Sequence, residues 1–66
     1  MFFGNIEAER ARKGMTVIEI AEKLNCTRET YANWVNGRTP IPSTKLLKMK
    51  ELFGDVTIDY LLHADK

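Results

Sequence analysis

Residues 17–37 of the chain have the sequence VIEIAEKLNCTRETYANWVNG. Apolar residues recur at helical spacing in its first part, at Val17, Ile20, Ala21 and Leu24, and again in its second part, at Tyr31, Trp34 and Val35. Asn25 stands between the two parts, and asparagine is the best non-glycine residue for a turn with a positive φ angle. The small side chain of Ala21 allows a second helix to cross closely. The stretch therefore predicts two short amphipathic helices joined by a tight turn.

Capping signals indicate where these two helices begin and end. Thr16 precedes the first helix and Glu19 follows three residues later, which is a capping-box pattern. Thr27 is expected to cap the second helix, and Asn36-Gly37 is expected to end it with residues that tolerate the left-handed conformation. The helix pair and its caps thus cover about residues 16–36.

Similar signals predict three more helices around this pair. Asn5 is expected to cap a first helix that runs to about Lys13 and ends at Gly14. After a proline-containing connector, a fourth helix starts at about Ser43, and its core face is predicted to consist of Leu46, Leu47, Met49, Leu52 and Phe53. Thr57 is expected to cap a short fifth helix that contains Ile58, Tyr60, Leu61 and Leu62. No segment favours a strand, so the predicted fold class is all-α.

The length of the chain limits its organisation. With 66 residues it is expected to form one domain over residues 1–66. No apolar run approaches the roughly 18 residues of a transmembrane helix, and the start lacks the basic and apolar regions of a signal peptide. We therefore expect a cytoplasmic protein with no membrane association.

Residues that carry chemistry are few. Cys26 is the only cysteine, so an internal disulfide is impossible, and with only His63 beside it a zinc site is not expected. We interpret Cys26 as a small buried apolar residue. A single histidine also gives no catalytic dyad or triad. The sequence therefore predicts no enzyme activity, no metal, no cofactor and no small-molecule ligand.

The charges of the chain allow two interpretations. Ten Lys and Arg residues oppose nine Asp and Glu residues, for a net charge of +1, whereas many nucleic-acid-binding proteins are far more basic. The distribution is less even, because Arg28 and Arg38 flank the second helix of the pair, and Lys45, Lys48 and Lys50 follow on the next one. In one interpretation this face is locally basic. In the other, which charge alone favours, it is an ordinary solvated surface of mixed charge.

Five motifs occur in order along the chain: Arg10-x-x-x-Gly14-Met15-Thr16, Ile20-Ala21-Glu22-Lys23-Leu24, Thr27-Arg28, Trp34-Val35-Asn36-Gly37-Arg38 and Thr57-Ile58-Asp59-Tyr60-Leu61-Leu62. With these motifs, from about Ile6 to Leu62, the chain resembles the Cro and repressor-type helix-turn-helix family of phage and bacterial transcription regulators. The resemblance implies a compact, lambda-repressor-like domain of five helices, with the helix-turn-helix at the second and third. It also implies that the third helix lies in the major groove of DNA and that a dimer reads the operator half-sites.

The resemblance assigns base reading to Arg28, Glu29 and Asn33. Helical geometry agrees, because positions 29 and 33 are one turn apart and position 28 lies at the N-terminal end that contacts bases in such modules. Arg28 can bond the O6 and N7 atoms of guanine, Asn33 can pair with adenine, and Glu29 can accept a bond from the cytosine amino group. The alternatives are an ordinary exposed charged pair at positions 28 and 29 and a solvent-facing polar residue at position 33.

Contacts with the DNA backbone are expected from Thr16, Thr30, Asn36 and Arg38. Thr16 and Asn36 also have structural roles at helix ends, and both roles can hold. Further DNA contacts are possible from Val17, Thr27, Arg10 and Lys45. For Lys45, a solvated side chain is the safer interpretation.

Two positions depart from the family pattern. The second helix usually starts with a glutamine that contacts DNA, but here the residue is Val17, whose methyl groups can touch a thymine methyl group. Many relatives pair the first-helix arginine with a glutamate near the end of the third helix, but here that position is Val35. Arg10 is therefore expected to contact phosphate or an acidic residue elsewhere.

The apolar fifth helix, residues 58–62, can simply close the core, but its many large side chains in so small a domain favour a second role. Ile58, Leu61 and Leu62 are therefore expected to pack against a second copy, in a two-fold dimer on DNA that places its recognition helices about 34 Å apart. The sequence thus predicts a sequence-specific regulator that binds double-stranded operator DNA, either a repressor or a Cro-like protein. The alternative, kept open by the low net charge and by Val17, is an antitoxin or adaptor that uses the same scaffold to bind protein.

Overall fold

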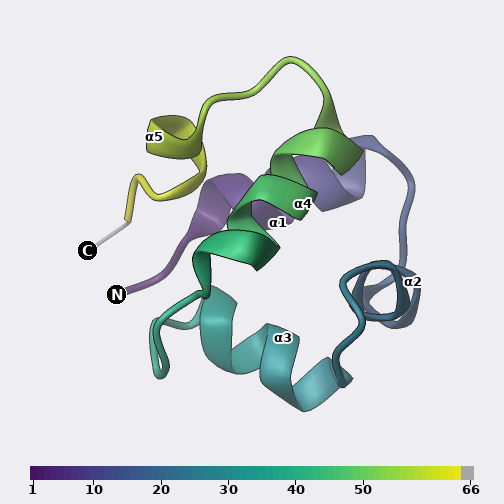
Figure 1. Cartoon of the computed structure of the whole chain (residues 1–66), viewed down its shortest axis with the longest axis vertical. Coiled ribbons are helices and arrows are strands. Elements are labelled where there is room, and N and C mark those ends of the chain that lie inside the picture. The colour runs from purple at the N-terminus through teal and green to yellow at the C-terminus, as the bar shows by residue number, and fades with distance from the viewer. Residues whose placement is uncertain (65–66) are drawn as a thin grey trace.

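The computed structural model of the chain describes residues 1–64, which form five helices and no strand (Figure 1). The helices are α1 (Gly4–Arg12), α2 (Val17–Lys23), α3 (Arg28–Val35), α4 (Ser43–Phe53) and α5 (Ile58–Leu61). Their order and approximate bounds confirm the predicted all-α class. None of the helices within residues 1–64 is long and apolar enough to cross a membrane.

All five helices contribute to one apolar core. The largest fully buried side chains come from every helix or its immediate end: Ile6, Ile20, Leu24, Tyr31, Met49, Phe53 and Leu61. Helix α3 packs against α2 and α1, while α5 packs against α1 and α4. Figure 1 shows α3 at one edge of the molecule and α5 at the opposite edge. The first turn of α3 is exposed at this edge, at Arg28 and Glu29.

The caps of the helix pair form as the sequence predicts. At the start of α2 the backbone N–H of Glu19 donates to Thr16 Oγ1 over 3.1 Å, and the backbone N–H of Thr16 donates to Glu19 Oε1 over 2.8 Å. At the start of α3, Thr27 Oγ1 accepts from the backbone N–H of Thr30 over 3.1 Å. Each cap satisfies backbone donors that the first helical turn leaves without partners. The two helix starts are therefore fixed by local hydrogen bonds.

The turn between α2 and α3 closes through Asn25. Its φ angle is +56°, in the left-handed region. The N–H of Asn25 donates to the Glu22 carbonyl over 3.0 Å, and the N–H of Cys26 donates to the Ala21 carbonyl over 2.9 Å. These two bonds satisfy the last carbonyls of α2 and reverse the chain direction within a few residues. This confirms the prediction that Asn25 adopts a positive φ angle in the turn.

The predicted start of the fourth helix is confirmed, because Ser43 is the first residue of α4. Two other local predictions are wrong. Asn5 does not cap α1, because the helix begins at Gly4, and Asn5 Nδ2 instead donates to the Tyr60 carbonyl in α5 over 2.8 Å. Leu47 is 61% exposed, since Leu46, Met49 and Phe53 define the buried side of α4, and the residue after Leu46 lies about 100° further round the helix.

Candidate nucleic-acid interface

An open hollow lies between the N-terminal ends of α2 and α3. We call it the α2–α3 groove, and it is lined by Thr16, Val17, Ile18, Thr27, Arg28, Glu29 and Ala32. The lining comes from the two helix starts that the threonine caps hold in place. The groove therefore combines apolar side chains of α2 with the charged first turn of α3.

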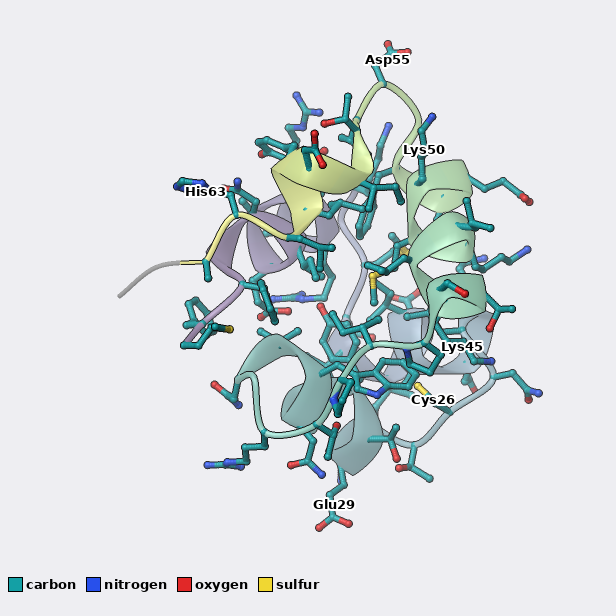
Figure 2. All side chains as sticks on the ribbon, turned by 60° about the vertical axis from the view of Figure 1, so that its left-hand side comes forward. Cys26, Glu29, Lys45, Lys50, Asp55 and His63 are labelled. Atoms are coloured by element: carbon teal, nitrogen blue, oxygen red, sulfur yellow. The ribbon has the colours of Figure 1, made fainter. Side chains whose placement is uncertain are left out.

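Arg28 and Glu29 form the charged rim of this groove. They are the first two residues of α3, and both are exposed. Neither side chain has a hydrogen-bond or ion-pair partner among residues 1–64. Figure 2 shows Glu29 pointing away from the body of the protein at the end of the molecule. Both groups are thus available to a partner outside the chain.

The third residue expected to read bases has a different position. Asn33 lies one turn after Glu29 on α3, is partly buried and does not line the groove. Ala32 lines it instead. The structure thus brings Arg28 and Glu29 together at the groove and leaves Asn33 further along the same helix.

Two groove residues, Ile18 and Ala32, are missing from the sequence prediction. Ile18 is 52% exposed, although it is a large apolar residue. Its signal was in the sequence, because Ile18 stands outside the buried stripe of α2 that Ile20 and Ala21 define. Ala32 gave a weaker signal, since its place four residues after Arg28 puts both on one face of α3.

Of the four residues expected to contact phosphate, three already make hydrogen bonds within the chain and one does not. Thr16 uses its backbone N–H and its Oγ1 in the capping box. Thr30 Oγ1 accepts from Thr27 Oγ1 over 2.9 Å, and Asn36 Nδ2 donates to the Ala32 carbonyl over 2.9 Å at the end of α3. Arg38 is exposed, and its side chain has no partner among residues 1–64. Arg38 is therefore the one cation of the four, and its side chain is free to bind a partner outside the chain.

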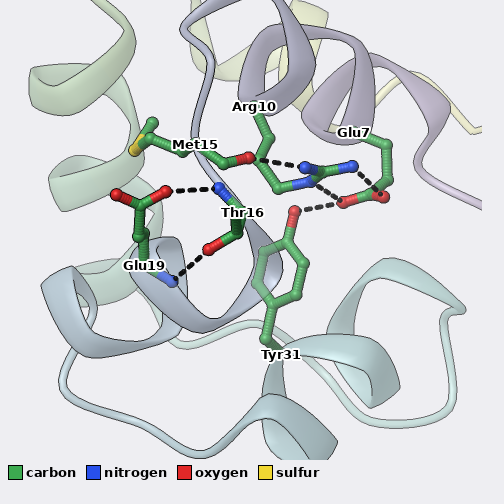
Figure 3. A network of polar contacts seen from close by, with 6 residues as sticks. All are labelled: Glu7, Arg10, Met15, Thr16, Glu19 and Tyr31. Atoms are coloured by element: carbon green, nitrogen blue, oxygen red, sulfur yellow. Dashed lines mark hydrogen bonds and ion pairs between the residues drawn. The ribbon is translucent and has the colours of Figure 1, made fainter.

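Two other cations are held inside the protein. Arg10 forms an ion pair with Glu7 at 3.0 Å, and its Nη1 donates to the Met15 carbonyl over 2.6 Å (Figure 3). Lys45 Nζ donates to the Leu24 carbonyl over 2.7 Å, at the end of α2 where carbonyls lack helical partners. We therefore leave Arg10 and Lys45 out of the interface. For Arg10, the expected acidic partner elsewhere in the chain is Glu7.

Around Arg10 there is a cluster that the sequence did not reveal. The hydroxyl of Tyr31 donates to the Glu7 carboxylate that Arg10 also binds (Figure 3), and we call these three residues the inner polar cluster. Burial alone would raise the pKa of Glu7, but the hydrogen bonds from Arg10 and Tyr31 hold it below its ordinary value of 4.5. Burial and the neighbouring Glu7 raise the pKa of Tyr31. The carboxylate is thus charged and the phenol neutral at physiological pH.

A second satisfied cluster joins α1 to α5. Glu9 is 5% exposed, pairs with Arg12 at 2.8 Å and accepts from the Tyr60 hydroxyl over 3.0 Å. Burial favours the neutral form of Glu9, but these two partners outweigh it and lower the pKa of the carboxylate. The cluster borders a smaller hollow, and every buried polar side-chain atom among residues 1–64 has a partner.

Cys26 and His63 lie apart in the structure. Cys26 is partly buried against the core, and burial raises the pKa of its thiol. His63 is exposed, and Figure 2 shows it on a different side of the molecule from Cys26. Within residues 1–64, no group of three or more His, Cys, Asp or Glu side chains is arranged to hold a metal ion.

The three residues expected at a dimer contact differ in exposure. Leu62 is 38% exposed, Ile58 is partly buried against the core, and Leu61 is 0% exposed. Leu61 is therefore a core residue and offers no surface to a second copy, contrary to its expected role. The excess of apolar side chains on α5 is partly explained by the core.

Comparison with known proteins identifies this arrangement of helices. The family model described as "Helix-turn-helix" matches residues 6–61, which include all of α2, α3 and the groove between them. No curated protein and no solved structure matches the chain.

Proposed function

The chain belongs to the Cro and repressor-type helix-turn-helix family of DNA-binding transcription regulators, and from this premise we propose that it represses transcription by occupying an operator in double-stranded DNA. One observation carries the proposal. Arg28 and Glu29 are exposed on the first turn of α3 without internal partners, while Arg10 and Lys45 are bound within the protein. Charged groups left free at the start of this helix suit base edges in a major groove.

Base reading is assigned to the N-terminal half of α3. Arg28 donates two bonds to the O6 and N7 atoms of guanine, and Glu29 accepts from the amino group of cytosine. Asn33, one turn further along, reaches an adenine. Each good base contact discriminates by roughly 1–3 kcal/mol against the wrong base.

Backbone contacts hold this helix in register. Arg38, just beyond the end of α3, neutralises a phosphate, and Arg28 and Arg38 thereby bracket the helix with cations. Thr16, Thr30 and Asn36 supply neutral donors to phosphate oxygens. Because these contacts do not depend on sequence, they raise affinity for all DNA alike.

A second copy of the chain completes the operator complex. Leu62 is 38% exposed and Ile58 lies beside it on α5, so this end of the molecule offers apolar surface to a two-fold partner. Such a dimer sets two α3 helices about 34 Å apart, the length of one turn of DNA.

The test is selection of bound duplexes from a random pool, followed by a salt series on the selected duplex. We expect a palindromic site with half-sites one turn apart, and an affinity that falls steeply with salt because several phosphates are neutralised. Absence of binding at low salt, or an affinity independent of salt, would overturn the proposal. The competing antitoxin or adaptor function predicts one of these two results.

A further inference from the structure

The α2–α3 groove contains one large apolar side chain, Ile18, that does not belong to the core. Ile18 lies in the first turn of α2 and is 52% exposed. Between Val17 and Val35, a stretch described throughout, no other large apolar side chain is exposed to this degree. The buried side of α2 is already formed by Ile20 and Ala21. Ile18 therefore adds little to the core and presents its side chain to whatever enters the groove.

The neighbours of Ile18 make this part of the groove more apolar than the sequence suggests. Thr16 and Thr27 both line the groove, but the hydroxyl of each is engaged in capping its helix. Val17 and Ala32 contribute only carbon atoms. Val17, Ile18 and Ala32 thus form an apolar strip in the groove, next to the charged rim made by Arg28 and Glu29.

In the major groove of DNA, the apolar group presented by a base edge is the C5-methyl of a pyrimidine. It stands beside the exocyclic group at C4, where an arginine or a glutamate can make a hydrogen bond. We propose that the α2–α3 groove binds the C5-methyl group of one pyrimidine in each half-site, an inference that rests on the proposed function. Ile18 is then a specificity-determining residue, with Val17 and Ala32 completing the apolar strip.

Removal of the methyl group alone provides the first test. The probe is the duplex recovered by selection, synthesised with each thymine of both half-sites replaced in turn by deoxyuridine. Loss of one buried methyl group corresponds to a roughly fourfold lower affinity at the contacted position. Deoxyuridine at the other positions leaves affinity unchanged. Binding that is indifferent to the methyl group at every position would overturn this inference and leave the proposed function standing.

Thymine and 5-methylcytosine carry the same methyl group, and a second pair of duplexes distinguishes them. Cytosine and 5-methylcytosine are compared, each opposite guanine, at the position where deoxyuridine weakens binding. Tighter binding of the thymine duplex than of the 5-methylcytosine duplex assigns the site to thymine, and the reverse order assigns it to 5-methylcytosine. In either case, tighter binding of the 5-methylcytosine duplex than of the cytosine duplex supports a methyl contact, and equal binding of these two contradicts it.

Variants then assign the contact to Ile18. In Ile18→Ser and in Ile18→Ala, the fourfold effect of deoxyuridine should shrink towards none, because the apolar partner is removed. The matched control is Leu47→Ser, since Leu47 is 61% exposed on α4 and lies outside the groove. The control should keep the full effect. A full deoxyuridine effect in both Ile18 variants would overturn the role of Ile18. If selection recovers no duplex, the proposed function fails and this inference fails with it.

Discussion

The inner polar cluster and the rim of the α2–α3 groove both contain an arginine and a glutamate, but these side chains are paired in the cluster and unpaired on the rim. In the cluster, the Arg10 guanidinium and the Glu7 carboxylate bind each other, and Tyr31 completes the set. On the rim, Arg28 and Glu29 are sequence neighbours that make no ion pair. Removing a polar group from water costs free energy unless the group is hydrogen-bonded, whereas an exposed group is hydrated and remains free to bind a partner. The cluster therefore contributes to the stability of the fold, whereas the rim is available for the binding that we propose.

The largest expected effect comes from breaking the inner polar cluster. Arg10→Met removes the partner of Glu7 and the donor to the Met15 carbonyl, so we expect the free energy of unfolding to fall by about 2 kcal/mol, between the values for exposed and buried ion pairs. For a chain this short, the melting temperature should drop by roughly 10 °C. Thermal and denaturant unfolding measure both quantities.

The matched control for this change is Arg28→Met on the rim. It removes the same charge from an exposed site and should alter the free energy of unfolding by less than about 0.5 kcal/mol. Equal destabilisation by the two variants would contradict the division between cluster and rim.

The second expected effect is on DNA affinity, and it tests the proposed role of the rim residue Arg28. Arg28→Ala should cost roughly 1–3 kcal/mol of binding and remove the preference at one base position. Arg38→Ala should weaken all sequences alike and lower the slope of log affinity against log salt by about one. Competition binding with single-base variants of the selected duplex separates these outcomes. A uniform loss in both variants would show that position 28 contacts phosphate.

These two regions were not equally visible in the sequence. Thr16, Thr27 and Asn25 act through residues at most five positions away, so their signals are local and the structure confirms them. The inner polar cluster joins residues 24 positions apart, and Asn5 bonds a carbonyl 55 positions away. No local pattern encodes such contacts, because they exist only after the helices pack.

The candidate site shows the same limit. The position of Arg28 and Glu29 in the first turn of α3 was predictable, because Thr27 marks the start of the helix. The groove was not, since it depends on how the start of α2 meets the start of α3, and so Ile18 and Ala32 were missed. Leu61 was misassigned for a related reason: which side of a four-residue helix is buried depends on the elements that pack against it.

Acid gives a milder way to disturb the inner polar cluster. The pKa of Glu7 is lower in the folded chain than its ordinary value of 4.5, so the unfolded chain binds a proton first as the pH falls. Stability from this group is therefore present above pH 4.5 and is lost as the pH falls through the folded pKa. Denaturant unfolding from pH 6 to about pH 3 should show this decline. Arg10→Met should show a smaller decline, and an unchanged acid dependence in that variant would contradict the assigned cause.

The smallest expected effect is the difference between the two tyrosines that donate to glutamates on α1. Tyr31 is 2% exposed and Tyr60 is 38% exposed, although each hydroxyl binds a glutamate on α1. Tyr31→Phe should lower the free energy of unfolding by about 1–2 kcal/mol, because Tyr31 is buried and water replaces its lost hydrogen bond poorly. Tyr60→Phe should cost less, since Tyr60 is partly exposed and water can reach the site of the lost hydroxyl. Both changes should raise the pKa of the affected glutamate towards its ordinary value and move acid unfolding to higher pH, which NMR titration of the carboxyl groups would detect. A larger loss in Tyr60→Phe than in Tyr31→Phe would mean that the link between α1 and α5, rather than the inner polar cluster, carries more of the polar stabilisation.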